Sequence, residues 1–290
     1  EQKPNDALHA YHLAMLARKR GDLETAHGQL TEYFASSSMD AGTGSYELLK
    51  ELLEQEFKNP VRVKRLYIRQ LEELHEADPD NRVLLATIIN ELIDTEQWQR
   101  ARVCCEQMLS KRKSAFLYQQ MLQAFHGLWE SGEDDQQTVD ILVRLLAKLA
   151  GSSGDVSSPV MEEMSQDATL VDRMLALVTP MLEDPGQFEE RPAEQEGRSL
   201  AGRIVTTRVE VAIAVGSLAI ASQQAEKANS LFKFAIAQQP AQQARYLETW
   251  ALRLLIADEL ERAIEVLEKA IGDDQVRQKQ GFYFFLASAA

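Results

Sequence analysis

The chain has 290 residues, 45% of them hydrophobic, and a formal net charge of −14. Its apolar content is ample for a large core, whereas its negative charge disfavours binding to nucleic acid and to anionic membrane surfaces. Only eight prolines and 14 glycines interrupt a sequence rich in helix-forming residues, and strand-like alternation is nearly absent. We therefore expect an all-α protein that does not bind nucleic acid.

In chain order, the first strong signal is a helical hairpin near the amino terminus. Two amphipathic segments, "ALHAYHLAMLARKRG" and "DLETAHGQLTEYF", are joined by the turn "RGD" at residues 20–22. Within the second segment, Ala26 lies four residues before Leu30, and Tyr33 follows three residues later. The spacing i, i+4, i+7 predicts the buried stripe of an amphipathic helix, and so short a turn permits only an antiparallel pair.

The same stripe recurs in residues 97–109, 224–236 and 259–271, and another apolar helix precedes each of these segments. In each, an alanine again lies four residues before a larger core residue: Ala101 before Cys105, Ala228 before Phe232 and Ala263 before Leu267. The small side chain permits close approach of the preceding helix. The last two alanines are 35 residues apart, close to the roughly 34-residue period of a two-helix repeat.

These units resemble the tetratricopeptide repeat family, whose motif places small residues where two antiparallel helices cross. Residues 244–275 carry the motif best, through Leu247, Trp250, Ala251, Leu254, Leu260, Ala263, Leu267 and Ala270. Residues 7–38, 82–113 and 209–240 carry it less completely, so that about half of the chain is covered. The resemblance implies a right-handed α-solenoid of about six to seven helix-turn-helix repeats.

Residues 44–81 and 115–150 also read as helical hairpins, although they depart from the motif. At the carboxyl end, "QKQGFYFFLASAA" places Phe284 and Phe285 where the first helix of a following unit would carry its core residues. We therefore expect the chain to end inside a repeat, with the alternative that this last helix is itself the cap of the array. We also expect this apolar helix to permit self-association with another copy. The amino terminus, "EQKPND", lacks an initiator methionine, so the chain is expected to be processed or excised from a longer protein.

The composition changes near the middle of the chain. Residues 151–159 are rich in glycine and serine, and residues 183–197 are acidic and contain two prolines. These stretches predict solvated loops. We expect amino-terminal hairpins over 1–150, an irregular insert with one helix over 151–198, and carboxyl-terminal hairpins over 199–290.

Motifs for catalysis or cofactor binding are missing from the sequence. It offers no phosphate-binding loop, no dinucleotide fingerprint, no H-E-x-x-H and no paired-cysteine metal spacing. We expect no enzyme, no cofactor and no metal. One alternative is that His9 and His12, which lie three residues apart, ligate zinc together with His27. The adjacent Cys104 and Cys105 point about 100° apart on a helix, so we expect Cys105 in the core and Cys104 near the surface.

The longest apolar run, "VEVAIAVGSLAIA" at residues 209–221, contains Glu210. It is shorter than the roughly 20 residues that a membrane span needs, so we expect a buried helix and no membrane insertion. The cell compartment stays open: a soluble, cytoplasmic protein is slightly favoured, and export stays an alternative because the amino terminus is expected to be processed or truncated.

The family resemblance also implies a concave surface lined by the first helix of each hairpin. The residues at the matching positions are Tyr11, Met15, Arg18, Ala86, Asn90, Ile93, Glu210, Ile213, Ser217, Arg245, Glu248 and Leu252. One subtype of the family grips a peptide carboxylate with lysine and asparagine on early helices. Asn90 is suitably placed for that role, but Ala86 stands where the lysine is required, so this subtype is disfavoured.

The leading hypothesis is therefore a non-enzymatic scaffold for protein–protein interaction that binds a peptide or protein segment in this groove. The alternative is a sensor, oligomerisation or assembly-factor segment of a larger multidomain regulator. A helical metal-binding protein or enzyme is the third and least favoured reading.

Overall fold

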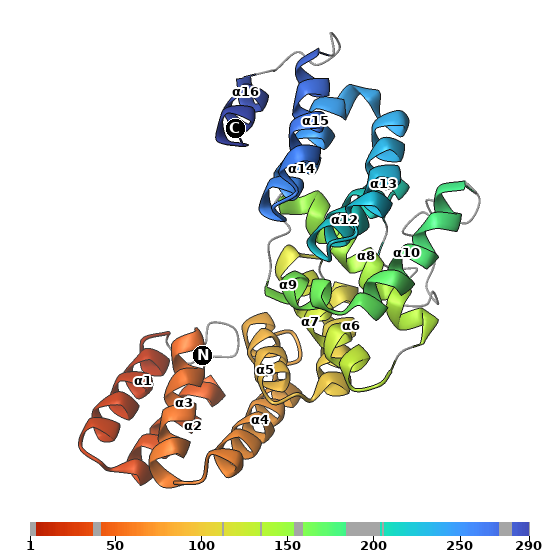
Figure 1. Ribbon diagram of the computed structural model, residues 1–290. Coiled ribbons are helices and arrows are strands. Elements are labelled where there is room, and N and C mark those ends of the chain that lie inside the picture. Colours follow the sequence, from red (N-terminus) through yellow and green to blue (C-terminus); the bar gives the residue numbers. More distant parts are fainter. Residues whose placement is uncertain are drawn as a thin grey trace. The chain divides into compact units, whose positions relative to one another are not determined.

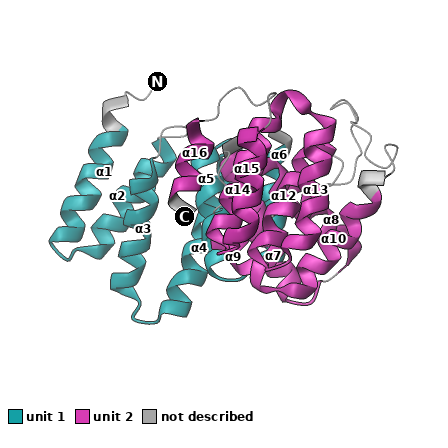
Figure 2. Cartoon of the chain, turned by 45° about the horizontal axis from the view of Figure 1, so that its top comes forward, with its two compact units in different colours: residues 1–113 teal, residues 114–290 magenta. Residues whose placement is uncertain are grey.

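The computed structural model describes residues 4–36, 42–111, 113–133, 135–153, 159–183, 204, 206–272 and 280–289. Throughout these ranges every regular element is a helix, and no strand occurs (Figure 1). The expected all-α architecture of helical repeats is confirmed, whereas the right hand of the solenoid stays a prediction. The contacts divide the chain into two compact units, residues 1–113 and 114–290 (Figure 2).

Unit 1 consists of three helical hairpins, in which each helix packs against the next in sequence. Its helices are α1 (Pro4–Lys19), α2 (Leu23–Ser36), α3 (Thr43–Glu56), α4 (Pro60–Ala77), α5 (Arg82–Asp94) and α6 (Trp98–Lys111). Side-chain caps fix where several of them begin. Asn59 accepts hydrogen bonds from the first turn of α4, Asn81 accepts one from Leu84 in α5, and Asp22 accepts one from Thr25 in α2. Such caps satisfy backbone donors that have no partner within the helix.

Unit 2 contains the remaining helices of the described part of the chain and is built around one of them, α12. Its elements are α7 (Ala115–Glu130), α8 (Gln136–Ser153), α9 (Pro159–Gln166), α10 (Ala168–Glu183), α12 (Arg208–Ala221), α13 (Ala225–Gln238), the short 3₁₀ helix η2 (Pro240–Gln242), α14 (Gln243–Ile256), α15 (Leu260–Gly272) and α16 (Gln280–Ala289). Helix α12 contacts α8, α9, α10, α13 and α14. Every residue from Val211 to Ile220 is buried, as expected for a helix that is apolar on all sides.

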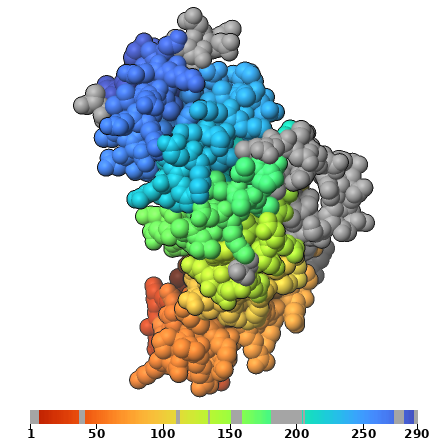
Figure 3. Space-filling model, turned by 45° about the vertical axis from the view of Figure 1, so that its right-hand side comes forward, coloured from red at the N-terminus to blue at the C-terminus, as the bar shows by residue number. Residues whose placement is uncertain are grey.

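The compact units do not coincide with the three segments expected from composition. The division falls after Lys113. The insert was expected to hold one helix but contains both α9 and α10; both pack against α12 of unit 2, and α10 also packs against α8. Residues 184–198 of that insert lie outside the described residues. Within unit 2, the surface colours follow the order of the chain from yellow-green to blue (Figure 3), because neighbouring hairpins pack on one another.

The helix-crossing residues expected from the repeat pattern are completely buried. Ala26, Ala101, Ala228 and Ala263 all have 0% exposure. In the first helix of the α12–α13 hairpin, an added Cβ at Gly216 would lie 3.0 Å from Cε2 of Phe232. The two helices therefore approach so closely that only glycine fits without a shift of the neighbouring ring.

A repeated turn geometry supports the repeat assignment independently of the buried stripe. Gly21, Glu96, Gln223 and Asp258 all have positive φ, at 78°, 56°, 63° and 61°. Each lies five residues before the buried alanine of its hairpin. In each turn the next residue donates its backbone N–H to a carbonyl five residues earlier, as Gln224 does to Ala219 at 2.7 Å. This hydrogen bond closes the end of the first helix at a left-handed residue. The same closure occurs at the same position in all four of these hairpins.

Candidate functional site

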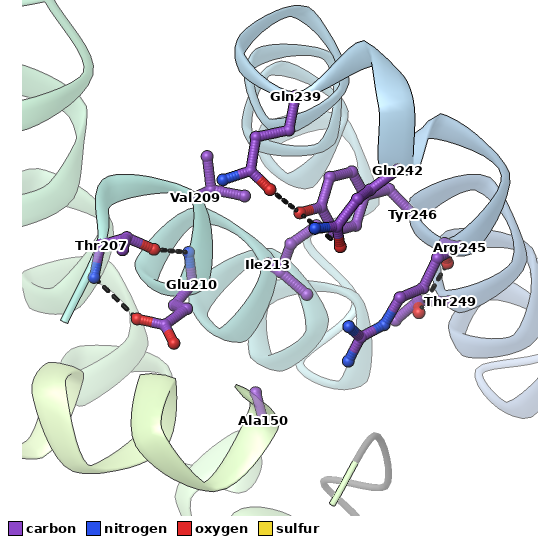
Figure 4. A pocket seen from close by; sticks show the side chains of 10 residues that line it. All are labelled: Ala150, Thr207, Val209, Glu210, Ile213, Gln239, Gln242, Arg245, Tyr246 and Thr249. Carbon is purple, nitrogen blue, oxygen red and sulfur yellow. Dashed lines mark hydrogen bonds between the residues drawn. The ribbon is translucent and has the colours of Figure 1, made fainter. Parts of the chain in front are cut away.

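A pocket of about 220 Å³ lies inside unit 2, where α8, α12, η2 and α14 meet (Figure 4). Its apolar lining comes from Ala150 at the end of α8 and from Val209 and Ile213 of α12, all of which are buried. Its polar lining comes from Thr207 and Glu210 at the start of α12, from both ends of the turn between α13 and α14, and from α14 itself. The pocket therefore combines an apolar floor with a polar edge.

The α12 side of the pocket begins with a capping box. The backbone N–H of Thr207 donates to Oε2 of Glu210 at 2.7 Å, and the backbone N–H of Glu210 donates to Oγ1 of Thr207 at 3.1 Å. These paired bonds fix the first turn of α12 and hold the Glu210 carboxylate in place. Nζ of Lys148, on α8, lies 3.6 Å from the same carboxylate oxygen. The negative charge at this edge is thus already paired.

The α14 side is organised by Tyr246. Its hydroxyl donates to Oε1 of Gln239 at 2.5 Å and also lies 3.4 Å from Oε1 of Gln242. Burial raises the pKa of Tyr246, against the opposing effect of the nearby Arg245 charge. The phenol is therefore neutral at pH 7 and remains a hydrogen-bond donor. Two glutamines from the η2 turn are held beside the pocket by this one side chain.

Arg245 contributes a positive charge to the rim of the pocket. The residue is exposed, and its side chain reaches into the space above Ala150 (Figure 4). Among the described residues, no ion pair or hydrogen bond to its guanidinium is found. Thr249, one turn later on α14, donates its hydroxyl to the Arg245 carbonyl at 2.9 Å and also lines the pocket.

The structure brings together some of the residues expected to line a groove. Glu210, Ile213 and Arg245 all line the pocket. Glu248 is exposed and lies beside α16, since an added Cβ at Gly281 would be 3.6 Å from its Oε1. Leu252 is 39% exposed on α14.

Ser217 does not present a surface to any ligand. Its exposure is 0%, and its hydroxyl donates to the carbonyl of Ile213 at 2.8 Å within α12. The residue lies on a helix that is covered on several sides by α8, α9, α10, α13 and α14. We therefore remove Ser217 from the candidate binding residues.

The expected groove residues of unit 1 lie on α1 and α5. Tyr11, Met15 and Arg18 are half-buried on α1, where the Tyr11 ring packs 5.4 Å from that of Tyr33. On α5, Asn90 is exposed, whereas Ala86 and Ile93 are half-buried.

Ion pairs join successive first helices of unit 1. Arg18 of α1 pairs with Glu51 of α3, and Lys50 of α3 pairs with Glu91 of α5 at 2.6 Å. The Arg18 charge is therefore already engaged within unit 1.

The sequence reasoning missed the residues that the η2 turn and α14 supply, namely Gln239, Gln242, Tyr246 and Thr249. It considered only fixed positions on each first helix, whereas the pocket also uses the connection between two hairpins. One feature of the sequence could have indicated part of this pocket. The stretch "TRVE" at residues 207–210 is a capping-box pattern that marks the start of α12 beside the pocket.

The alternative metal site does not assemble among the described residues. His9 and His12 are exposed on α1, and Nε2 of His27 lies 3.4 Å from Oε2 of Glu56. In the described ranges, no three His, Cys, Asp or Glu side chains are placed to hold a metal ion. No described helix has the length and apolar character to cross a membrane.

The two cysteines lie as expected on α6. Cys105 is completely buried, whereas Cys104 is half-buried. Burial raises the pKa of both thiols, and most strongly that of Cys105. A thiol whose pKa is raised is a poor nucleophile at neutral pH, so the geometry favours a packing role for both.

No protein-family profile matches the chain, and no curated protein matches it with significant similarity. The tetratricopeptide resemblance therefore depends on the residues quoted for it.

Proposed function

We propose that this chain is a non-enzymatic scaffold for protein–protein interaction, and that it binds a segment of another protein in the pocket of unit 2. The observation that carries the proposal is the convergence of Glu210, Ile213 and Arg245 in one pocket. The family resemblance implied these residues on a binding surface, and they come from the first helices of two consecutive hairpins.

The size of the pocket supports a protein segment over a small-molecule substrate. Its volume of about 220 Å³ is below the roughly 300–1,000 Å³ of typical small-molecule sites. It suits one or two side chains of a longer ligand. A buried apolar floor with a polar rim is the arrangement at which protein interfaces anchor a residue.

The test is selection of displayed random dodecapeptides on the full chain and on a variant with a blocked pocket. Thr249→Trp places a large side chain at the pocket wall. The control is Ser230→Trp on α13, because Ser230 is exposed and its hydroxyl also donates to a carbonyl of its own helix, at 2.9 Å.

We expect peptides to be enriched on the unmodified chain and on Ser230→Trp, but not on Thr249→Trp. Circular dichroism and thermal melting establish that both variants fold. Equal enrichment on both variants, or no enrichment on the unmodified chain, would exclude this pocket as the binding site.

Self-association through α16 is a second candidate function. Tyr283 and Phe284 are 56% and 70% exposed, whereas Phe282 is 3% exposed and anchors the helix. None of the ten residues from Gln280 to Ala289 is charged, although the whole chain has a net charge of −14. A second copy of the chain can therefore meet this helix without repulsion between like charges on the two helices.

Sedimentation equilibrium tests this second function. We expect the chain to dimerise in a concentration-dependent manner and Phe284→Glu to be monomeric. A monomeric unmodified chain at about 100 μM, a concentration well above the micromolar affinities of weak interfaces, would exclude it.

A further inference from the structure

The hydrogen-bonding groups of the pocket in unit 2 are unequally occupied. The Glu210 carboxylate accepts the Thr207 N–H and lies near the Lys148 ammonium, and Oε1 of Gln239 accepts the Tyr246 hydroxyl. The acceptors at the rim are thus engaged from within the protein. The donors are not engaged to the same extent, because no partner of the Arg245 guanidinium is found in the described part of the chain.

An unengaged guanidinium selects a particular ligand chemistry. Its planar array of N–H donors matches a carboxylate, to which it can form two parallel hydrogen bonds. The nearest counter-charge in the lining, Glu210, is on α12 and is already paired with Lys148. A ligand carboxylate at Arg245 therefore completes a charge pair, whereas a ligand cation would leave the arginine uncompensated.

The floor of the pocket adds a second requirement. Val209 and Ile213 are 7% and 9% exposed, and Ala150 is 9% exposed. These aliphatic side chains are suited to a small aliphatic side chain of the ligand, whose burial is favourable by the hydrophobic effect. Because the pocket holds about 220 Å³, the aliphatic group and the carboxylate must be close together along the ligand.

From these features we infer that the pocket binds an extended acidic segment, in which an Asp or Glu side chain pairs with Arg245 and a neighbouring aliphatic residue packs on Ile213. This inference rests on the proposed scaffold function and names the chemistry of its ligand. A side-chain carboxylate is favoured over the carboxyl terminus of a chain, because a terminus is captured by backbone donors, whereas the backbone N–H groups of Thr207 and Glu210 in this lining are occupied by the capping box.

The charge of the chain gives this arginine a role in specificity. The net charge is −14, so acidic partners are repelled over most of the surface and approach is favourable only where a local cation dominates. Binding is expected to weaken with rising salt concentration, since an exposed arginine is screened over about 10 Å at 0.1 M.

The experiment uses fluorescein-labelled hexapeptide mixtures with an acetylated amino terminus and an amidated carboxyl terminus. The third position is fixed as Glu, Gln or Lys, and the others are Ala, Ser, Val or Leu. Fluorescence polarisation is measured with the full chain, with Arg245→Glu and with Lys233→Glu. Lys233 is exposed on α13 and outside the pocket, so the two variants carry the same change in net charge.

We expect the Glu mixture to bind about tenfold more tightly than the Gln mixture, as for a charge-assisted bond over a neutral one. Arg245→Glu is expected to reverse the order, so that the Lys mixture binds best, whereas Lys233→Glu retains the preference for Glu. If the preference for Glu persists in Arg245→Glu, the inference is overturned.

Two other outcomes separate this inference from the proposed function. Equal binding of all three mixtures that is lost in Thr249→Trp would overturn the acidic preference but leave the scaffold function standing. If the unmodified chain binds no mixture more tightly than Thr249→Trp does, both the inference and the proposed function are overturned. The same mixtures with a free carboxyl terminus are measured alongside, and binding of these alone would overturn the assignment to a side chain.

Discussion

The left-handed turn residues predict that a glycine substitution stabilises the chain. Gln223 is exposed, has a φ of 63° and occupies the turn position that Gly21 occupies in the first hairpin. A left-handed conformation costs a residue with a Cβ about 1–2 kcal/mol. Glycine avoids this cost, but it loses about 0.5–1 kcal/mol through its greater freedom in the unfolded chain. We therefore expect Gln223→Gly to raise the free energy of unfolding by about 0.5–1 kcal/mol.

The reciprocal substitution tests the same reasoning in the opposite direction. Gly21 has a φ of 78°, and an added Cβ there would meet no atom within 4 Å. Gly21→Ala therefore changes backbone strain without a steric clash, and it should lower the free energy of unfolding by about 1 kcal/mol. Urea unfolding followed by circular dichroism measures both changes. The slope of the unfolding free energy against urea concentration is expected to be the same in both variants as in the unmodified chain. A Gln223→Gly midpoint equal to or below that of the unmodified chain would refute the reasoning.

Three further predictions concern packing, tyrosine ionisation and thiol reactivity. Gly216→Val should lower the free energy of unfolding by about 1–3 kcal/mol through overpacking, whereas Gly28→Val, where a Cβ meets nothing within 4 Å, should be nearly neutral in the same urea assay. Burial raises the pKa of Tyr46 from 10.0 to about 12. Because the folded state then holds the phenol proton more tightly than the unfolded state, stability should be fully present below pH 10 and fall between about pH 10 and pH 12. Urea midpoints across this pH range measure the decline in stability, and Tyr46→Phe should make the decline smaller. If the midpoint falls with pH as steeply in Tyr46→Phe as in the unmodified chain, the prediction is wrong. With a thiol reagent at pH 8, Cys104 should react in the folded protein and Cys105 only on unfolding, so simultaneous release of two equivalents would contradict the burial of Cys105.

The second helices of the hairpins could be predicted well from the sequence. The segment expected at residues 259–271 is α15, Leu260–Gly272, and that expected at residues 224–236 is α13, Ala225–Gln238. The prediction succeeds because the stripe of small and large residues at i, i+4 and i+7 is local. It also succeeds because the short turn leaves one way for the two helices to pair.

The pocket could be predicted only in part, because it depends on contacts that no single repeat contains. Glu210 and Arg245 are at positions that the family resemblance implies for a binding surface. Gln239 enters the pocket only because Tyr246, seven residues later, holds its amide. Ser217 was misplaced because α12 is covered on several sides by other helices, which include α9 and α10, whose positions have no signature in the repeat motif.

The burial of α12 has a consequence for how unit 2 unfolds. In a regular array each repeat contacts only its neighbours, so segments can open one at a time from the ends. Helix α12 instead contacts five of the other described helices, which include members of both flanking hairpins and the intervening α9 and α10. Opening α12 would remove a face from each of them at once. Its amide protons should therefore exchange last, and only by global unfolding of the unit. The pocket is thus built on the helix of unit 2 that opens least readily.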